Sequence, residues 1–173
     1  MVDCYLSWDA ELAERMARRL GPYRVRWFED VLTLDHLEEL AALRPRVAPI
    51  QLAGGEHEMT EAGFARAAAA GAGTGALDVW QPDITWCGGI SAALRILELA
   101  RPSRTPVIPH RGGEPWGLHF IVATDCEQLA ETMPERWQPG VDELWLGEPI
   151  VADGVIEPSD APGFGVELNR ELL

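Results

Sequence analysis

Residues 77–90, LDVWQPDITWCGGI, join a short apolar run to a long segment rich in alanine and leucine. The apolar run predicts a buried strand that ends at Asp83, and the segment after the two glycines predicts a helix. Asp83 is therefore either an ordinary turn residue or a carboxylate that is aimed at a partner. The rest of the chain bears on this choice.

The same strand-then-helix unit recurs along the chain about every 25 residues. We expect strands within residues 2–7, 24–30, 47–58, 77–83, 104–113 and 126–132, and helices within 8–23, 34–46, 59–73, 88–102 and 114–125. The expected strands are apolar throughout rather than alternating, which is typical of a parallel sheet buried on both faces. The pattern predicts an α/β fold, either an open doubly wound sheet or part of a (β/α) barrel.

Polar residues at the carboxyl ends of the expected strands favour the barrel. These residues are Asp3, Glu29, Glu56, Asp83, His110 and Glu131. The first five follow one another at intervals of 26, 27, 27 and 27 residues, about one βα unit each. In a barrel such ends converge on the face that holds the active site, and no GxGxxG or Walker-type loop follows any expected strand. We therefore expect a partial TIM-type (β/α) barrel.

Three of these strand ends carry carboxylates on consecutive strands. Asp3, Glu29 and Glu56 would place three negative charges close together, where they would repel one another. A hard divalent cation removes this repulsion, and a set of oxygen ligands favours Mg²⁺. Taken singly, each could instead be a helix cap or a surface carboxylate. Their regular spacing, about one βα unit apart, favours a magnesium site.

The next strand ends carry a candidate proton acceptor. His110 lies one unit after Asp83, and a neighbouring carboxylate would fix the tautomer of the imidazole and stabilise its protonated form. Glu131 would face the same opening and could polarise an oxygen or donate a hydrogen bond. The alternatives are a structural Asp–His hydrogen bond and an exposed glutamate. A metal and a base together indicate removal of the proton next to a carboxylate, through an enediolate that the metal stabilises.

Composition excludes several classes of protein. The net charge of −14 argues against binding to nucleic acid, which requires clustered basic residues. No run of 18 apolar residues and no basic-then-apolar leader is present, so we expect no membrane association. Three scattered cysteines without CxxC spacing fit reduced thiols, and we expect a cytoplasmic protein.

The last part of the chain differs in composition. Residues 134–173 are rich in proline, glycine and aspartate, and Asp153-Gly154 between two apolar runs predicts a hairpin turn. We expect residues 1–133 to form the barrel part and residues 134–173 to form a tail that packs on the barrel or on a further domain.

Several motifs, in order along almost the whole chain, resemble a known family. They are MVDCYLSWD, WFED, GGEHE, DVWQPDITWCGG, VIPHRGG, IVATDCEQLAE and PGFGVELNR. The chain resembles the C-terminal barrel of enolase-superfamily enzymes of the mandelate racemase group, and within it the acid-sugar dehydratases similar to L-rhamnonate dehydratase. The resemblance implies that Asp3, Glu29 and Glu56 are Mg²⁺ ligands, that His110 is the base with Asp83 as its partner, and that Glu131 is the acidic residue of the last strand.

The resemblance also implies what lies outside this chain. Family members begin with an α+β capping domain and two earlier barrel strands, so we expect about six of the eight strands here and a C-terminal fragment. Val31 stands where the family usually has proline, and Arg111-Gly112-Gly113 replaces a Gly-Ser-Ser loop. The second difference leaves the identity of the sugar acid open.

The expected function is Mg²⁺-dependent dehydration of a sugar acid such as L-rhamnonate, in which loss of the β-hydroxyl yields a 2-keto-3-deoxy acid. The family habit implies a homo-oligomer for the full-length protein. One alternative is a racemase or epimerase of the same superfamily, although the lysine base of such enzymes has no counterpart on the expected strands. The other alternative is a non-catalytic remnant of the barrel.

Overall fold

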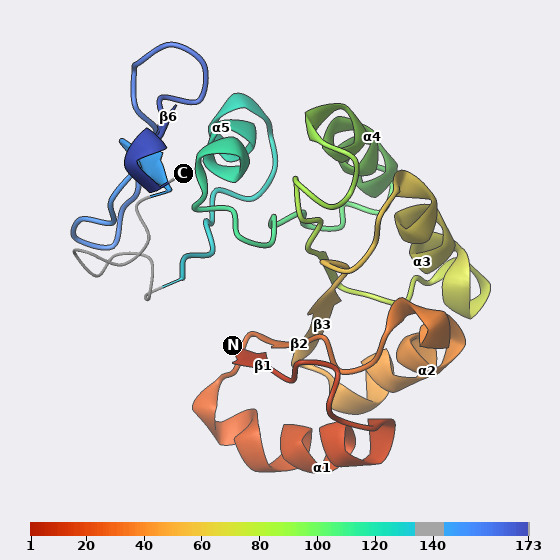
Figure 1. Cartoon of the computed structure of the whole chain (residues 1–173). Coiled ribbons are helices and arrows are strands. Elements are labelled where there is room, and N and C mark those ends of the chain that lie inside the picture. Colours follow the sequence, from red (N-terminus) through yellow and green to blue (C-terminus); the bar gives the residue numbers. More distant parts are fainter. Residues whose placement is uncertain (134–143, 173) are drawn as a thin grey trace. The chain divides into compact units, whose positions relative to one another are not determined.

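The computed structural model describes residues 1–133 and 144–172. The chain divides into two compact units, and the division falls between Val107 and Ile108. The first unit alternates strands and helices as the sequence predicts (Figure 1). Its strands are β1 (Val2–Asp3), β2 (Trp27–Glu29), β3 (Gln51–Gly54) and β4 (Val79–Trp80). Its helices are α1 (Ala10–Leu20), α2 (Leu37–Val47), α3 (Glu61–Gly73) and α4 (Ile90–Ala100), with short 3₁₀ turns at Gly21–Tyr23 and Leu34–His36.

The four strands form one parallel sheet in the order β1-β2-β3-β4. A further parallel bridge joins Trp80 to Val107. Consecutive helices pack against one another and form an arc outside the strands (Figure 1). A doubly wound sheet would reverse its strand order and place helices on both faces. The sequential order with helices on one side is the winding of a barrel, so the predicted α/β parallel architecture is confirmed for this unit.

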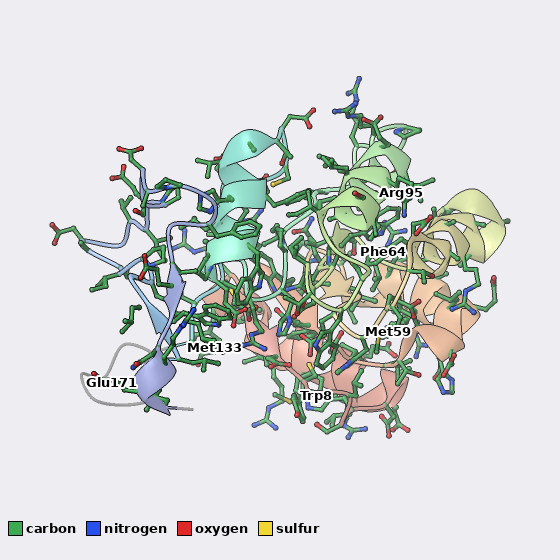
Figure 2. All side chains as sticks on the ribbon, turned by 45° about the horizontal axis from the view of Figure 1, so that its top comes forward. Trp8, Met59, Phe64, Arg95, Met133 and Glu171 are labelled. Carbon is green, nitrogen blue, oxygen red and sulfur yellow. The ribbon has the colours of Figure 1, made fainter. Side chains whose placement is uncertain are left out.

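The core of the first unit lies between the sheet and the helices. Trp27 and Phe28 of β2 are both almost completely buried, as expected for a strand covered on both faces. Phe64 of α3, labelled in Figure 2, is fully buried. Its ring centroid lies 5.3 Å from that of Trp80. This aromatic contact joins α3 to β4 and contributes stability beyond the apolar area that it buries.

Helix ends follow local sequence signals. Asp9 caps α1, because its Oδ1 accepts a hydrogen bond from the backbone nitrogen of Leu12 at 2.6 Å. The helical conformation of α3 is interrupted at residues 70–72, where Gly71 and Ala72 have positive φ angles. The glycine-rich end of this segment thus turns the chain out of the helix before β4.

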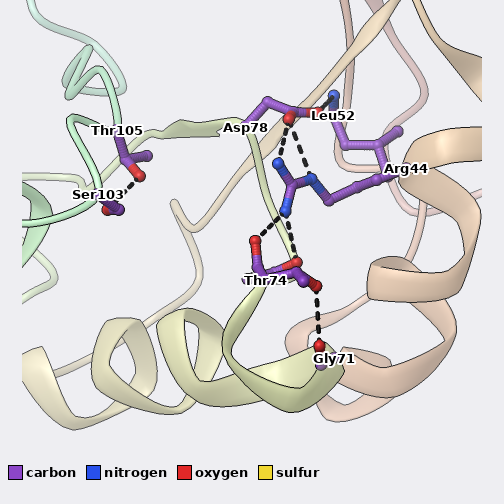
Figure 3. A network of polar contacts seen from close by, with 8 residues as sticks. Arg44, Leu52, Gly71, Thr74, Asp78, Ser103 and Thr105 are labelled. Atoms are coloured by element: carbon purple, nitrogen blue, oxygen red, sulfur yellow. Dashed lines mark hydrogen bonds and ion pairs between the residues drawn. The ribbon is translucent and has the colours of Figure 1, made fainter.

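Arg44 fastens the amino-terminal side of β4 to α2 (Figure 3). Its Nε donates to Asp78 Oδ1 at 3.0 Å, and its Nη1 donates to the carbonyl oxygen of Gly75 at 2.7 Å. Asp78 Oδ2 in turn accepts from the backbone nitrogen of Leu52 in β3 at 2.9 Å. This network ties one helix to two neighbouring strands at the end of the sheet opposite to the predicted site, where side chains serve stability.

The second unit contains α5 (Pro115–Ala123), which was predicted within residues 114–125. Two short strands, β5 (Trp145–Leu146) and β6 (Glu167–Leu168), pair antiparallel, and a 3₁₀ turn spans Arg170–Leu172. Ala152 and Val155 exchange both backbone hydrogen bonds, and Asp153 and Gly154 have φ angles of 51° and 78°. The predicted hairpin turn at Asp153-Gly154 is therefore confirmed.

The strand predicted within residues 126–132 is wrong. This segment forms no β-strand. A backbone hydrogen bond holds it to the preceding loop, in which the Gly113 nitrogen donates to the Glu131 carbonyl oxygen at 2.7 Å. Polar residues fill most of CEQLAET, and such a segment lacks the continuous apolar side chains of a strand buried on both faces. The six strands predicted for the barrel are thus not all formed, since four strands and one bridge make up the parallel sheet of the described residues.

The predicted division between residues 133 and 134 borders residues 134–143, which lie outside the described part of the chain, and it stays a prediction. Within the described residues, the helices are too short or too polar to cross a membrane.

Candidate functional site

Asp3 and Glu29 are the last residues of β1 and β2 and are register partners in the parallel sheet. Register partners on parallel strands direct their side chains to the same face. Glu29 is buried, and its Oε2 accepts a hydrogen bond from Trp27 Nε1 at 2.8 Å. Asp3 is exposed, and its Oδ1 accepts from the backbone nitrogen of Tyr5 at 2.8 Å. The sheet therefore brings two of the predicted ligands to one end of neighbouring strands.

Glu56 follows the end of β3 by two residues and has a different set of neighbours. Its Oε1 lies 3.3 Å from His57 Nε2, and the same nitrogen lies 3.6 Å from Asp30 Oδ2. Among the described residues, Asp30, Glu56 and His57 form a group whose potential ligand atoms all lie within 4.8 Å of one another. Asp3 and Glu29 are not in this group, so the predicted set of Asp3, Glu29 and Glu56 stays a prediction.

Asp30 and His57 were not among the predicted site residues. Each directly follows a predicted ligand, in the pairs Glu29-Asp30 and Glu56-His57. These neighbouring pairs are the signal in the sequence that could have pointed to them.

The turn after β2 places the Asp30 carboxylate over β3. Asp30 is buried and has a φ angle of 46°, which lies in the left-handed region. A Cβ on Gly54 would come within 2.7 Å of Asp30 Oδ1. Glycine at position 54 therefore leaves the space that the buried carboxylate occupies.

The carboxylates at the strand ends act on a buried thiol next to them. Burial, followed by the negative charges of Asp3, Asp30 and Glu29, raises the pKa of the Cys4 thiol to about 12. The effect of three carboxylates on one sulfur shows that negative potential concentrates at this end of β1 and β2.

Asp83 follows the end of β4 by three residues and is buried. Its Oδ1 accepts hydrogen bonds from Thr85, through the backbone nitrogen at 2.7 Å and the hydroxyl at 2.6 Å, and from the Trp86 nitrogen at 3.1 Å. One oxygen of Asp83 thus organises the turn before α4. The predicted partner His110 belongs to the other unit, so the Asp83–His110 pair stays a prediction.

His110 and Glu131, both in the second unit, lie close to one another. His110 Nε2 lies 3.9 Å from Glu131 Oε2, and the His110 side chain is largely buried. The same glutamate oxygen accepts a hydrogen bond from the backbone nitrogen of Arg111 at 2.6 Å. An imidazole held beside a carboxylate is an arrangement that can accept and return a proton.

A cavity of about 390 Å³ adjoins the cluster of Asp30, Glu56 and His57. The loops after β2 and β3 supply most of its wall, which consists of Leu6, Asp30, Leu32, Thr33, Leu34, Asp35, Gly55, His57 and Glu58. The cavity gives small molecules and water a path to this cluster.

Comparison with known proteins defines the class of this fold and site. The sequence profile described as "Enolase C-terminal domain-like" matches residues 1–172. The chain therefore belongs to the enolase C-terminal domain-like family, a TIM-barrel type of α/β fold, and the resemblance to the enolase superfamily is confirmed.

One curated relative, from Caldivirga maquilingensis, carries the name "Putative L-rhamnonate dehydratase". It is 37% identical over 178 residues, which cover 100% of this chain and 44% of the relative. This chain therefore spans less than half the length of that protein.

Solved structures of similar fold include two dehydratases and a racemase. L-rhamnonate dehydratase from Gibberella zeae has a TM-score of 0.85 at 29% identity, over 99% of this chain and 44% of that one. A racemase from Streptomyces coelicolor with bound magnesium has a TM-score of 0.85 at 26% identity, over 100% and 45%. L-talarate dehydratase from Polaromonas sp. JS666, in complex with Mg and L-glucarate, has a TM-score of 0.81 at 27% identity, over 99% and 45%.

Proposed function

We propose that this chain is the barrel part of a Mg²⁺-dependent hydro-lyase that dehydrates a sugar acid of the L-rhamnonate type to a 2-keto-3-deoxy acid. The observation that carries the proposal is the register pairing of Asp3 with Glu29, with Glu56 just beyond the next strand. Relatives named as dehydratases of rhamnonate and talarate support the substrate class.

The donor set fits the ion. Asp3, Glu29 and Glu56 offer carboxylate oxygens, which Mg²⁺ prefers. Burial is the main cause of the raised pKa of Cys4, and the charges of Asp3, Asp30 and Glu29, which a cation would offset, add to it. Magnesium is also present in the related racemase and talarate dehydratase structures. When bound, Mg²⁺ supplies positive charge that stabilises the anion formed from a carboxylate substrate on proton loss.

The proton transfers would fall to the second unit. His110 would take the proton from the carbon next to the substrate carboxylate and return it as the β-hydroxyl leaves as water. Glu131 lies 3.9 Å from His110 and would hold the imidazole in position and favour its protonated form. Asp83 would stabilise the same imidazolium from the strand before it.

A racemase is the second candidate, because the Streptomyces coelicolor racemase matches this chain as well as the rhamnonate dehydratase does. Racemisation needs acid–base groups on both faces of the carbon. This chain contains no lysine that could serve on the second face, so a partner base would have to come from another residue type or another part of the protein. The dehydratase is therefore the better-supported function.

Magnesium binding to the chain itself tests the proposal. We expect Mg²⁺ to raise the thermal midpoint of the wild-type chain, because the ion binds the folded state, and we expect Asp3→Asn to abolish the rise. Asp160→Asn, which changes an exposed carboxylate of the second unit, is the matched control and should keep the full response. Equal midpoints with and without Mg²⁺ in the wild type would contradict the metal assignment.

The reaction is tested with L-rhamnonate as probe, in the protein extended to the length of its relatives. Formation of a 2-keto acid, detected as its semicarbazone, supports dehydration, and His110→Asn should remove both this product and exchange of the α-proton with deuterium. Exchange with inversion and without a keto acid would favour the racemase.

A further inference from the structure

The two distances from His57 to its neighbouring carboxylates are close to the donor spacing of a metal centre. His57 Nε2 lies 3.3 Å from Glu56 Oε1 and 3.6 Å from Asp30 Oδ2. A tetrahedral ion with bonds of about 2.0–2.1 Å to nitrogen and oxygen holds its donors about 3.3 Å apart. We propose that Asp30, Glu56 and His57 bind a divalent transition-metal ion of the Zn²⁺ type.

The nitrogen donor selects the class of metal. Mg²⁺ prefers oxygen ligands, whereas imidazole suits Zn²⁺ and the other divalent ions of the first transition row. The Asp30, Glu56 and His57 site therefore differs in chemistry from the oxygen-only set of Asp3, Glu29 and Glu56.

The surroundings also suit an ion. The side chains of Asp30 and Glu56 are 8% and 13% exposed, so the two carboxylates lie in a poorly solvated place, where a cation would offset the repulsion between them. The His57 side chain is 46% exposed, and its ring lies 5.8 Å from that of Trp86 at an angle of 38°. Asp30 and His57 line the cavity of about 390 Å³, which gives the ion an entry path and room for a water ligand.

The shared residue Glu56 has a consequence for regulation, and this step alone rests on the proposed function. A carboxylate engaged by a transition-metal ion with Asp30 and His57 is withdrawn from the set with Asp3 and Glu29. Zn²⁺ bound to Asp30, Glu56 and His57 should therefore weaken the binding of Mg²⁺ to Asp3, Glu29 and Glu56. By linkage, bound Mg²⁺ should weaken the binding of Zn²⁺ to the same degree.

Zn²⁺ titration of the whole chain, with the affinity measured by competition with a chromophoric chelator, tests the site. We expect one Zn²⁺ per chain, and we expect His57→Asn to weaken binding by at least about tenfold. His36→Asn is the matched control, because His36 is also exposed and also pairs with a glutamate, at 3.4 Å from Glu39. It should change the affinity by less than about twofold. The metal-free thermal midpoints of both variants confirm that they fold.

X-ray absorption of the zinc-loaded wild type and of His57→Asn identifies the ligand atoms directly. Outer-shell scattering from one imidazole, lost in His57→Asn, supports the site. Coordination by oxygen alone, or by sulfur from one of the buried cysteines, would overturn it, as would equal affinity in His57→Asn and the wild type.

Asp3→Asn separates the two metal hypotheses. This variant should keep the zinc affinity while it loses the Mg²⁺ response. An imidazole-bound Zn²⁺ in a wild-type chain that does not respond to Mg²⁺ would leave the zinc site standing and refute the magnesium ligands of the proposed function. A zinc affinity that falls with Asp3→Asn as much as with His57→Asn would overturn the separate site.

Discussion

Asp3 and Glu29 end neighbouring parallel strands as direct register partners, so two carboxylates face the same end of the sheet. Like charges side by side on a sheet are destabilising. A third carboxylate, Asp30, adds to the same negative potential, as the pKa of Cys4 shows. Such an arrangement lowers stability, and a cation-binding role would account for it.

The first prediction concerns this pair in the absence of metal. Glu29→Gln should raise the free energy of unfolding by about 0.5 kcal/mol, because it removes one charge while an amide oxygen can still accept the hydrogen bond from Trp27. Urea unfolding of Glu29→Gln, Asp3→Asn and the double variant measures the coupling. The double variant should gain less than the two single gains together, and strictly additive changes would contradict repulsion between the two side chains.

The fold of the first unit could be predicted because its signals are local. Each apolar strand is bounded by a turn, each helix carries buried apolar residues, and Asp9 caps α1. The strand expected within residues 126–132 failed because the spacing of units was extended into a polar segment. Spacing alone does not supply the neighbouring strand that a ladder requires.

The site could be predicted in part, for a different reason. The regular spacing of the strand ends predicted Asp3, Glu29 and Glu56 as ligands. The first two are register partners in the sheet, while the ligand roles of all three stay a prediction. The approach of Asp30 to His57 depends on a positive φ angle at Asp30 and on the missing side chain of Gly54. These are properties of two turns in three dimensions, and residue spacing does not contain them.

The second prediction concerns the network around Arg44. Arg44→Met should lower the free energy of unfolding by about 3 kcal/mol, because it removes several charge-assisted hydrogen bonds and leaves Asp78 partly buried without its cation. Arg46→Met is the matched control on the same helix, since Arg46 is about half exposed and pairs with Glu14 at the surface. The control should cost less than about 1 kcal/mol. Urea denaturation of both variants measures the difference, and equal losses would show that the network adds nothing beyond a surface ion pair.

The third prediction concerns Gly55, which follows β3 with a φ angle of 117°. A Cβ there would meet the Phe64 ring at 2.7 Å, so Gly55→Ala combines backbone strain with a clash against a buried ring. Gly73 also has a positive φ angle, of 90°, but a Cβ there would meet nothing within 4 Å. Gly55→Ala should therefore cost about 1–3 kcal/mol more than Gly73→Ala in the free energy of unfolding. Similar thermal midpoints for the two variants would show that Phe64 moves aside freely.

The last prediction concerns pH and the Cys4 thiol, which is 2% exposed. Its pKa in the folded chain is raised to about 12, first by burial and then by the nearby carboxylates. In the unfolded chain the pKa of a thiol is about 8.5. Below the unfolded value both states hold the proton, so the contribution of Cys4 to stability is complete. As the pH rises from about 8.5 to 12, the unfolded chain loses the proton first, and the free energy of unfolding of the metal-free protein should fall by up to about 1.4 kcal/mol per pH unit from this group.

Urea unfolding at pH 8, 9 and 10 measures that slope, and Cys4→Ala should flatten it. Cys126→Ala is the control: burial is the main cause that raises the pKa of this thiol as well, but the charges that add to it come from its sequence neighbours Asp125 and Glu127 and not from strand ends. The slope should therefore change less in Cys126→Ala than in Cys4→Ala. Equal slopes in Cys4→Ala and the wild type would mean that the thiol ionises in the folded chain as easily as in the unfolded one, and that the strand-end carboxylates do not act on it.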